Sequence, residues 1–321
     1  MTEHRIGITV AISTRGRPDA LARCLDALWA GRLRPDETVV VDQSDDERTR
    51  EDAERRRADG MPLVYVRNHS CGLGASQNAA FVRASHPVVA VTDDDCVPDE
   101  RWLATIASWF ATHPELDGVT GRVLPLPARG DRRFPVSSRT SMVPREFVSA
   151  ALPWEVGSGN NFALRRATYA RIGGCDVRLG PGSPAQGGVD MDLFHRLIRS
   201  GARIRYDPEL VVHHERQTRA ERSARRSMYG RGMGTAIALW RRAGDRSALG
   251  ILGQWVLLRI ARMRLAAGRG DWRDVRDEIV MLGATSRGLL SGWRLANAPG
   301  PARDVTGVEP VSATRDRGDG G

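Results

Sequence analysis

Short apolar runs alternate with helix-like stretches along the first 118 residues of the chain. Four of these runs are rich in Val or Ile and have the length of buried strands: residues 6–12, 38–41, 63–66 and 88–91. The segments between and after them predict helices, near residues 18–28, 45–60, 72–83 and 102–110. This alternation predicts an α/β fold with a mostly parallel, doubly wound sheet flanked by helices.

The pattern changes after residue 118. Five prolines between residues 124 and 153 predict an irregular segment. Next come a turn and strand at 157–165, an amphipathic helix at 190–200 and a short strand within 203–214. These elements are expected to belong to the same domain as the first half of the chain.

The last third of the chain differs in composition from the rest. Residues 216–296 predict helices in which Trp is interleaved with Arg, and residues 297–321, rich in Gly, Pro and Asp, predict a disordered tail. We therefore divide the chain into a domain of residues 1–215, a basic helical extension of residues 216–296, and the tail.

Positive charge is concentrated in the predicted extension. The chain has a formal net charge of +9, and all 48 of its basic residues are Arg. Residues 216–296 hold 17 Arg and 6 acidic residues, a net +11, whereas residues 1–215 hold 28 Arg and 29 acidic residues, a net −1. A basic helical segment favours an anionic membrane surface or another polyanion, and a solvated helical face is an equally good interpretation. No recognised nucleic-acid motif accompanies it, so no nucleic-acid partner is expected.

The cysteines and the apolar segments indicate in which cellular compartment the protein is expected. The four cysteines are scattered without a CxxC pair, which argues against a zinc knuckle or a disulfide framework and favours a reducing environment. Residues 1–5 show no signal-peptide pattern. The apolar stretch 251–260 contains Gln254 and Arg259 and is shorter than the roughly 18 residues that span a bilayer. We expect a cytoplasmic protein that can associate peripherally with the inner membrane face.

The most informative polar cluster closes the fourth predicted strand. Asp93, Asp94 and Asp95 follow the apolar run of residues 87–91 after one intervening residue, Thr92. Adjacent carboxylates repel one another, so a fold that keeps them together usually has a cation to bind, and open α/β sheets bind ligands at the carboxyl ends of their strands. Such oxygen ligands suit Mg²⁺ or Mn²⁺ shared with a substrate phosphate. A solvated turn is the alternative interpretation, because Asp is common in turns.

Other residues are expected at the same edge of the sheet. Asp42 ends the second strand as Asp93 ends the fourth. The Gly-rich stretch 72–78 enters a helix and can bring backbone amides close to a nucleotide, although such turns are common. Asp190 begins a helix, where it can act as an N-cap or as a general base. His214 follows a strand and could complete a metal's ligand set, although a lone His is more often packed or solvated.

Taken together, these motifs resemble family 2 glycosyltransferases of the GT-A fold, from about residue 6 to residue 215. Residues 93–98 (Asp-Asp-Asp-Cys-Val-Pro) match the family's DxD motif. The other matching stretches are residues 39–42, 72–80, 157–166, 173–176, 187–192 and 211–215. Two positions depart from the family pattern: Gln77 stands where Arg is usual, and Val189 stands where Glu is usual.

The resemblance implies an inverting glycosyltransferase that uses Mn²⁺ or Mg²⁺. It implies that residues 1–118 bind the nucleotide and that residues 119–215 hold the acceptor and catalytic groups. By the same resemblance Asp190 is the catalytic base, and Asp95 and His214 bind the metal. The residues expected to bind the donor are Thr14, Arg15, Asp42, Gly74, Asn78, Asp93 and Asp94.

The expected donor is a nucleoside-diphosphate sugar, with UDP as the default and GDP or dTDP as the other options. The acceptor is an unidentified hydroxyl group in cell-envelope polysaccharide, glycolipid or natural-product glycosylation. A lipid-linked acceptor would fit a membrane contact through residues 216–296. Trp154 and Glu155, in the irregular segment, are candidate acceptor contacts.

Three alternative functions are compatible with parts of the sequence. Asp93-x-Asp95-x-Val97 also fits the nucleophile pattern of haloacid-dehalogenase-type phosphatases, but that family usually places the motif on its first strand and uses a downstream Lys, which this chain lacks. A nucleotidyltransferase is disfavoured for the same lack of Lys. A nucleotide-sugar-binding protein without transferase activity is the third alternative.

Overall fold

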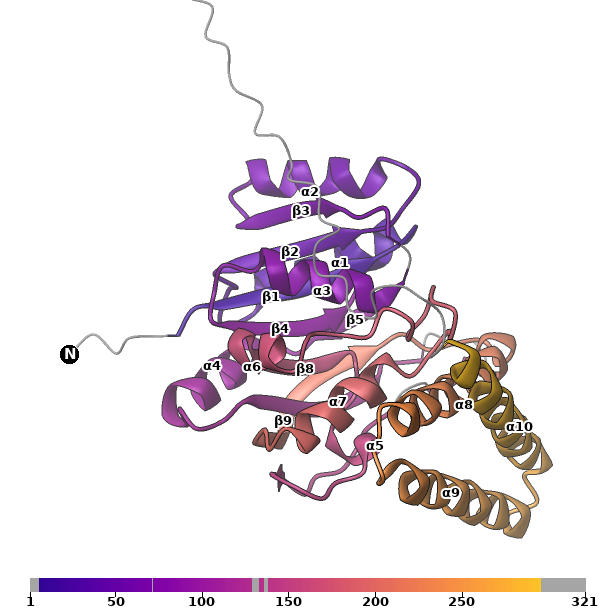
Figure 1. Cartoon of the computed structure of the whole chain (residues 1–321). Helices are drawn as coiled ribbons and strands as arrows, with labels where there is room; N and C mark the ends of the chain where they lie inside the picture. Colours follow the sequence, from indigo (N-terminus) through magenta and orange to yellow (C-terminus); the bar gives the residue numbers. More distant parts are fainter. Residues whose placement is uncertain (1–5, 71, 129–132, 136–137, 296–321) are drawn as a thin grey trace, which may run out of the picture.

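The computed structural model describes residues 6–70, 72–128, 133–135 and 138–295. In this part of the chain helices flank a nine-stranded mixed sheet, and three long helices, α8 to α10, lie at one side (Figure 1). The strands are β1 (Ile8–Thr14), β2 (Glu37–Asp42), β3 (Leu63–Arg67), β4 (Val88–Asp93), β5 (Cys96–Pro98), β6 (Gly118–Pro125), β7 (Arg145–Phe147), β8 (Asn161–Arg165) and β9 (Ile204–His214). The helices are α1 (Pro18–Ala30), α2 (Arg48–Ala58), α3 (Leu73–Arg83), α4 (Trp102–Thr112), α5 (Pro153–Val156), α6 (Arg166–Arg171), α7 (Val189–Arg199), α8 (Arg219–Arg242), α9 (Ala248–Gly268) and α10 (Trp272–Leu295).

The first four strands form the parallel half of the sheet, as the alternating pattern predicts. β1 pairs in parallel with β2 and β4, and β3 continues the sheet beyond β2. On the other side β8 is antiparallel to both β4 and β6, while β9 is parallel to β6. The strand order is β3-β2-β1-β4-β8-β6-β9-β5, with β7 paired to β9. The predicted α/β fold with a mostly parallel sheet flanked by helices is confirmed.

The register of the central strands brings polar residues to one edge. Thr14 at the end of β1 lies opposite Asp42 of β2, and Ser13 lies opposite Asp93 of β4. Alternate residues of β1 point to opposite faces of the sheet. Ile8, Val10 and Ile12 pack into a cluster with α1 and α4, whereas Ala11 packs into a second cluster with α3 and α7. Each face is therefore covered by helices, and the polar residues gather at the ends of the strands.

β6 is the longest of three strands, with β5 and β7, that the sequence pattern does not predict in the described part of the chain. It contains two glycines, and a Cβ at Gly121 would overlap the carbonyl oxygen of Leu210 on β9. The register between β6 and β9 shifts between Gly121 and Arg122. Pairing with a strand some 80 residues away, and not local propensity, therefore makes this segment extended.

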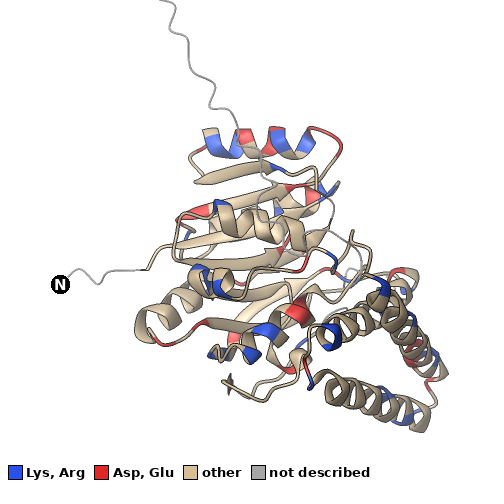
Figure 2. Ribbon diagram, viewed as in Figure 1, with Lys and Arg blue, Asp and Glu red and all other residues tan. Residues whose placement is uncertain are grey.

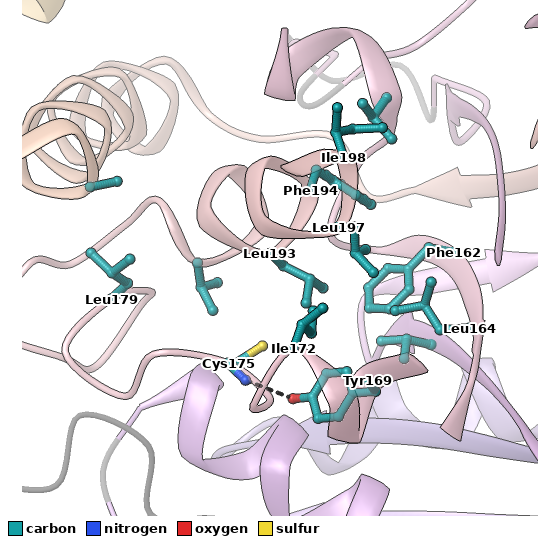
Figure 3. Close-up of a cluster of buried hydrophobic side chains, with 14 of the residues drawn as sticks. Phe162, Leu164, Tyr169, Ile172, Cys175, Leu179, Leu193, Phe194, Leu197 and Ile198 are labelled. Atoms are coloured by element: carbon teal, nitrogen blue, oxygen red, sulfur yellow. Dashed lines mark hydrogen bonds between the residues drawn. The ribbon is translucent and has the colours of Figure 1, made fainter. Parts of the chain in front are cut away.

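α7 is fixed to the sheet by its apolar face. Leu193, Phe194 and Leu197 are buried and belong to the same cluster as Phe162 and Leu164 of β8 (Figure 3). The rings of Phe162 and Phe194 meet edge to face, with centroids 5.9 Å apart. Burial of side chains of this size contributes roughly 1.5–3 kcal/mol each. The N-terminus of α7, which begins at the predicted catalytic segment, is held in place by this packing.

α8 and α10 approach each other closely enough for their backbones to touch. A Cβ added at any of four glycines would overlap backbone of the facing helix: Gly230, Gly234, Gly288 and Gly292. These helices and α9 form the predicted basic helical extension. No helix in the described part of the chain is both long and apolar enough to cross a bilayer. The predicted tail, residues 297–321, lies outside the described residues, and the division into domain and extension stays a prediction.

Candidate active site

A cavity of about 320 Å³ opens where β1, β4 and β9 end and α7 and α8 come together. Six of the residues predicted for the site line it: Thr14, Arg15, Asp93, Asp95, Asp190 and His214. They come from segments up to 200 residues apart in the chain, and the strand register and the packing of α7 bring them together.

The three consecutive aspartates have separate environments. Asp94 is fully buried; its carboxylate accepts a hydrogen bond from Thr14 Oγ1 (2.7 Å) and pairs with the Arg17 guanidinium (2.6 Å). Arg17 also donates to Asp95 Oδ2 (2.8 Å). Asp93 and Asp95 line the cavity, whereas Asp94 ties the end of β1 to the end of β4. One arginine thus pairs with two of the three carboxylates.

Asp95 and His214 are arranged as two ligands of one cation would be. The β5–β9 pairing places His214 opposite Cys96, and His214 Nε2 lies 3.5 Å from Asp95 Oδ1. His214 Nδ1 donates to the carbonyl oxygen of Glu215 (2.7 Å), which leaves Nε2 with its lone pair facing Asp95. Asp95 Oδ1 is buried and has no hydrogen-bond partner among the described residues. An oxygen and a nitrogen ligand fit Mn²⁺ or Mg²⁺.

Cys96 lies in the same group, since its sulfur and the ligand atoms of Asp95 and His214 are all within 4.8 Å of one another. Burial, with the nearby charge of Asp93, raises the pKa of the Cys96 thiol well above its ordinary value. A protonated thiol is a poor ligand for a hard cation. The side chain accepts a hydrogen bond from the Asn160 amide instead (3.6 Å).

If all three were ionised, Asp93, Asp94 and Asp95 would carry more negative charge than Arg17 and Arg225 offset. Burial, reinforced by Asp95 and Asp94, raises the pKa of Asp93 to about 8. Burial raises the pKa of Asp94 to about 6 although Arg17 opposes it. Burial also disfavours ionised Asp95, but His214, Arg17 and Arg225 outweigh it and lower its pKa. A divalent cation would remove the penalty for ionising Asp93 next to Asp95.

Asp190 faces the cavity from the first turn of α7. Gly188, just before it, has a φ of +85°, a left-handed conformation that glycine adopts without strain. The Asp190 Oδ1 accepts a hydrogen bond from the Met191 backbone amide (3.0 Å), and Gly159 packs against its side chain. Burial raises the pKa of Asp190 against these backbone hydrogen bonds. A half-buried carboxylate with a raised pKa is suited to accept a proton.

Four of the predicted donor residues lie outside the cavity lining: Asp94, described above, and Asp42, Gly74 and Asn78. Asp42 is fully buried and accepts hydrogen bonds from the Tyr65 hydroxyl and the Ser44 amide, both at 2.8 Å. Asn78 hydrogen-bonds the backbone of Cys175 and the Tyr169 hydroxyl. Gly74 packs against the carbonyl group of Asp176. The roles proposed for Asp42, Gly74, Asn78 and Asp94 toward a donor therefore stay predictions.

The two departures from the family pattern occupy buried positions. Gln77 accepts a hydrogen bond from the thiol of Cys175 (3.2 Å). Val189 is buried, lines the cavity and packs against Gly180. An apolar side chain therefore stands beside Asp190 where the family usually has a carboxylate.

The sequence analysis does not identify Arg17, Arg225, Met228 or Tyr229, which also line the cavity. Arg17 belongs to the polar turn after β1, so its place in that turn is a usable signal. Arg225 is one of 17 arginines in residues 216–296, and nothing in the sequence separates it from the others.

Comparison with known proteins identifies the family. Residues 9–172, about half of the chain, match the model of Glycosyl transferase family 2. The pre-mycofactocin glycosyltransferase of Mycobacterium tuberculosis is 27% identical over 310 residues, which cover 91% of this chain and 57% of that protein. The chain thus spans little more than half the length of this relative. The amylovoran biosynthesis glycosyltransferase AmsE of Erwinia amylovora is 34% identical over 112 residues, 34% of this chain and 41% of that protein.

Solved structures share the fold. The mannosyltransferase PcManGT from Pyrobaculum calidifontis, in complex with GDP-Man and Mn²⁺, superposes with a TM-score of 0.60 at 17% identity, over 90% of this chain and 88% of that one. Staphylococcus aureus TarS residues 1–349 give a TM-score of 0.57 at 16% identity, over 91% and 90% of the two chains. With the family match over residues 9–172, the chain belongs to glycosyl transferase family 2.

Proposed function

We propose that this protein transfers a sugar from a nucleoside-diphosphate sugar to an acceptor hydroxyl group, with a divalent metal and with inversion at the anomeric carbon. The observation that carries the proposal is the meeting of Asp95, His214 and Asp190 in one cavity. The first two can hold a cation, and the third can accept a proton. Membership of the family removes the phosphatase alternative.

On the donor side, we propose that Asp95 and His214 hold Mn²⁺ or Mg²⁺ and that Asp93 contacts the ribose. The metal, when bound, would supply positive charge that stabilises the departing diphosphate. His214 is suited to this role because burial lowers its pKa, which keeps the imidazole neutral near pH 7. Asp93 is hard to ionise beside Asp95, and a bound cation would relieve that cost and attract a diphosphate in turn.

On the acceptor side, we propose Asp190 as the general base. Its carboxylate takes the proton of the acceptor hydroxyl while the hydroxyl oxygen forms a bond to the anomeric carbon. The bond between that carbon and the diphosphate oxygen breaks in the same step, and the bonding electrons leave with the diphosphate. Because attack comes from the face opposite the leaving group, the configuration inverts and no covalent enzyme intermediate forms.

Known relatives suggest the classes of donor and acceptor. PcManGT was solved with GDP-Man and Mn²⁺, and GalNAc-T7 with UDP, GalNAc and Mn²⁺. We propose a UDP sugar as the first donor to test, with GDP and dTDP sugars next. For the acceptor we propose an envelope, glycolipid or natural-product hydroxyl; one relative, from Haloferax volcanii and 21% identical over 230 residues, is named a glucosyl-dolichyl phosphate glucuronosyltransferase.

We also propose that α9 places the enzyme on an anionic membrane that carries a lipid-linked acceptor. Its Ile251, Trp255 and Arg259 are buried against the neighbouring helices. Three leucines of α9 are 59–63% exposed: Leu249, Leu257 and Leu265. Exposed arginines lie on the same helix at 262 and 264 and directly after its end at 269, and Arg recurs along all three C-terminal helices (Figure 2). An apolar face with flanking Arg is suited to the interface of an anionic bilayer.

The activity is tested by screening UDP, GDP and dTDP sugars for hydrolysis that requires Mn²⁺ and stops with EDTA. With the active donor, Asp190→Asn should lower the transfer or hydrolysis rate by about 10²–10⁴-fold while donor affinity stays within a few-fold, since only the base is removed. Asp59→Asn, at the exposed end of α2, is the matched control and should keep the wild-type rate.

Near-wild-type turnover of Asp190→Asn would refute the role of this residue. Donor binding without turnover by the wild type would instead favour the nucleotide-sugar-binding alternative. Absence of both binding and turnover with every donor would overturn the proposed function.

A further inference from the structure

The wall of the cavity opposite the strand ends is formed by α8, which lies outside the predicted catalytic domain. Arg225, Met228 and Tyr229 of α8 line the cavity together with Asp95 and Asp190. Residues at this spacing share one face of a helix. α8 therefore presents one continuous face to the candidate active site, which is incomplete without it.

The same face of α8 continues onto the segment that precedes Asp190. A Cβ at Gly232 would overlap backbone atoms of Gly187 and Gly188, and a Cβ at Gly188 would come within 2.6 Å of the Gly232 carbonyl oxygen. The two backbones are therefore in direct contact, with no side chain between them. This contact fixes where the N-terminal half of α8, and Arg225 with it, stands relative to the cavity.

Arg225 differs from its neighbours on α8 in having no firm partner. Arg222 pairs with Asp274 of α10 at 2.8 Å, and Arg226 pairs with Glu278 of α10 at 2.9 Å. The guanidinium of Arg225 lies 3.8 Å from Asp95 Oδ2, beyond hydrogen-bond distance, and it makes no hydrogen bond to any described residue. Its side chain is 32% exposed, toward the cavity.

We propose that Arg225 binds the diphosphate of the sugar donor, an inference that rests on the proposed function. Asp95 is the proposed metal ligand, so a diphosphate shared with that metal would lie within reach of a guanidinium 3.8 Å from the same carboxylate. Arginine's planar fork of donors matches phosphate oxygens. Arg17 is less free to do this, because it is already bound to both Asp94 and Asp95. The donor site is then completed by a residue of the C-terminal extension.

The test measures equilibrium binding of UDP, GDP and dTDP by titration calorimetry with Mn²⁺ present, and continues with whichever the wild type binds. Arg225→Gln should weaken that nucleoside diphosphate by about 10- to 100-fold, the loss expected for a charge-assisted hydrogen bond. Arg225→Lys should lose less, because it keeps the charge without the fork. Binding of the corresponding nucleoside, which has no phosphate, should not change.

Arg219→Gln is the matched control, because it removes one positive charge from the exposed start of the same helix. Thermal melts of each variant show that it is folded. Arg225→Gln binding as tightly as the wild type would overturn the inference and leave the proposed function standing. Equal weakening by Arg219→Gln and Arg225→Gln would also overturn it, since the effect would then be general electrostatics. A wild type that binds none of the three diphosphates would overturn the proposed function, and this inference with it.

Discussion

At the scale of single residues, environment and not residue type decides what each carboxylate can do. Asp94 is enclosed and tied to Thr14 and Arg17, so it serves the structure of the strand ends. Asp95, one residue on, keeps a buried oxygen without a hydrogen-bond partner and faces His214. Asp190 stands apart from both and has only backbone donors near it. A metal ligand and a base can thus coexist in one cavity.

The raised pKa of Asp190 has a consequence for stability. Because burial raises this pKa in the folded state, the folded protein binds the proton more tightly than the unfolded chain does. The stabilisation is present below the unfolded pKa and is lost as pH rises through the folded pKa. We therefore expect Asp190→Asn to melt about 1–3 °C above the wild type at pH 8. The difference should shrink toward pH 5, as followed by thermal denaturation. A variant less stable than the wild type at pH 8 would contradict this.

At the scale of elements, glycine determines how the C-terminal helices meet the catalytic segment. The contact of Gly232 with Gly187 and Gly188 leaves no room for a methyl group. Overpacking of this kind typically costs about 1–3 kcal/mol when the surroundings must move. The part that must move here is the short segment leading into Asp190, or α8 with Arg225. We therefore expect a change in this packing to affect catalysis.

We expect Gly232→Ala to lower the transfer rate by about tenfold or more and to lower the melting temperature by a few degrees. Gly283→Ala is the matched control: it lies on α10 with no atom within 4 Å of an added Cβ, so it should keep the rate and leave stability unchanged or slightly higher. Steady-state kinetics and thermal melts of the two variants check this. Equal behaviour of the two would show that the contact is unimportant.

At the scale of the whole molecule, charge and apolar exposure coincide in the C-terminal helices. Residues 216–296 carry a net +11 while the rest of the chain is close to neutral. Some of these positive charges form ion pairs within the molecule, as Arg226 and Arg259 do with Glu278. Three leucines of α9 are exposed to solvent in the described structure, with arginines exposed near them. We therefore propose that this face of α9 contacts a lipid surface.

We expect the protein to co-sediment with vesicles that contain anionic lipid, more weakly at about 0.5 M salt, and only weakly with neutral vesicles. Replacing Leu257 and Leu265 together with Gln should reduce binding by about tenfold or more, because apolar burial is lost. Val82→Gln, an exposed apolar position on α3, is the control. Equal binding to neutral and anionic vesicles, or no effect of the double change, would contradict the membrane contact.

Local pattern determined much of this molecule. The Val-rich runs ending in Asp42 and Asp93 specify parallel strands by period and length, and the Leu and Phe spacing of residues 193–198 specifies α7. Strand and helix periods are local, because they are set within a few residues. The expectation that Asp95, Asp190 and His214 share one site came from the resemblance to the family, and all three line the cavity.

Only the tertiary structure decided the rest. β6 is extended because β9 pairs with it, and Asp94 points inward because Thr14 and Arg17 meet it there. Arg225 lines the cavity because of the position of α8. The contact of Gly232 with the backbone of Gly187 and Gly188 fixes that position. Contacts between distant segments depend on shape in three dimensions, and a single sequence carries no periodic signal for them.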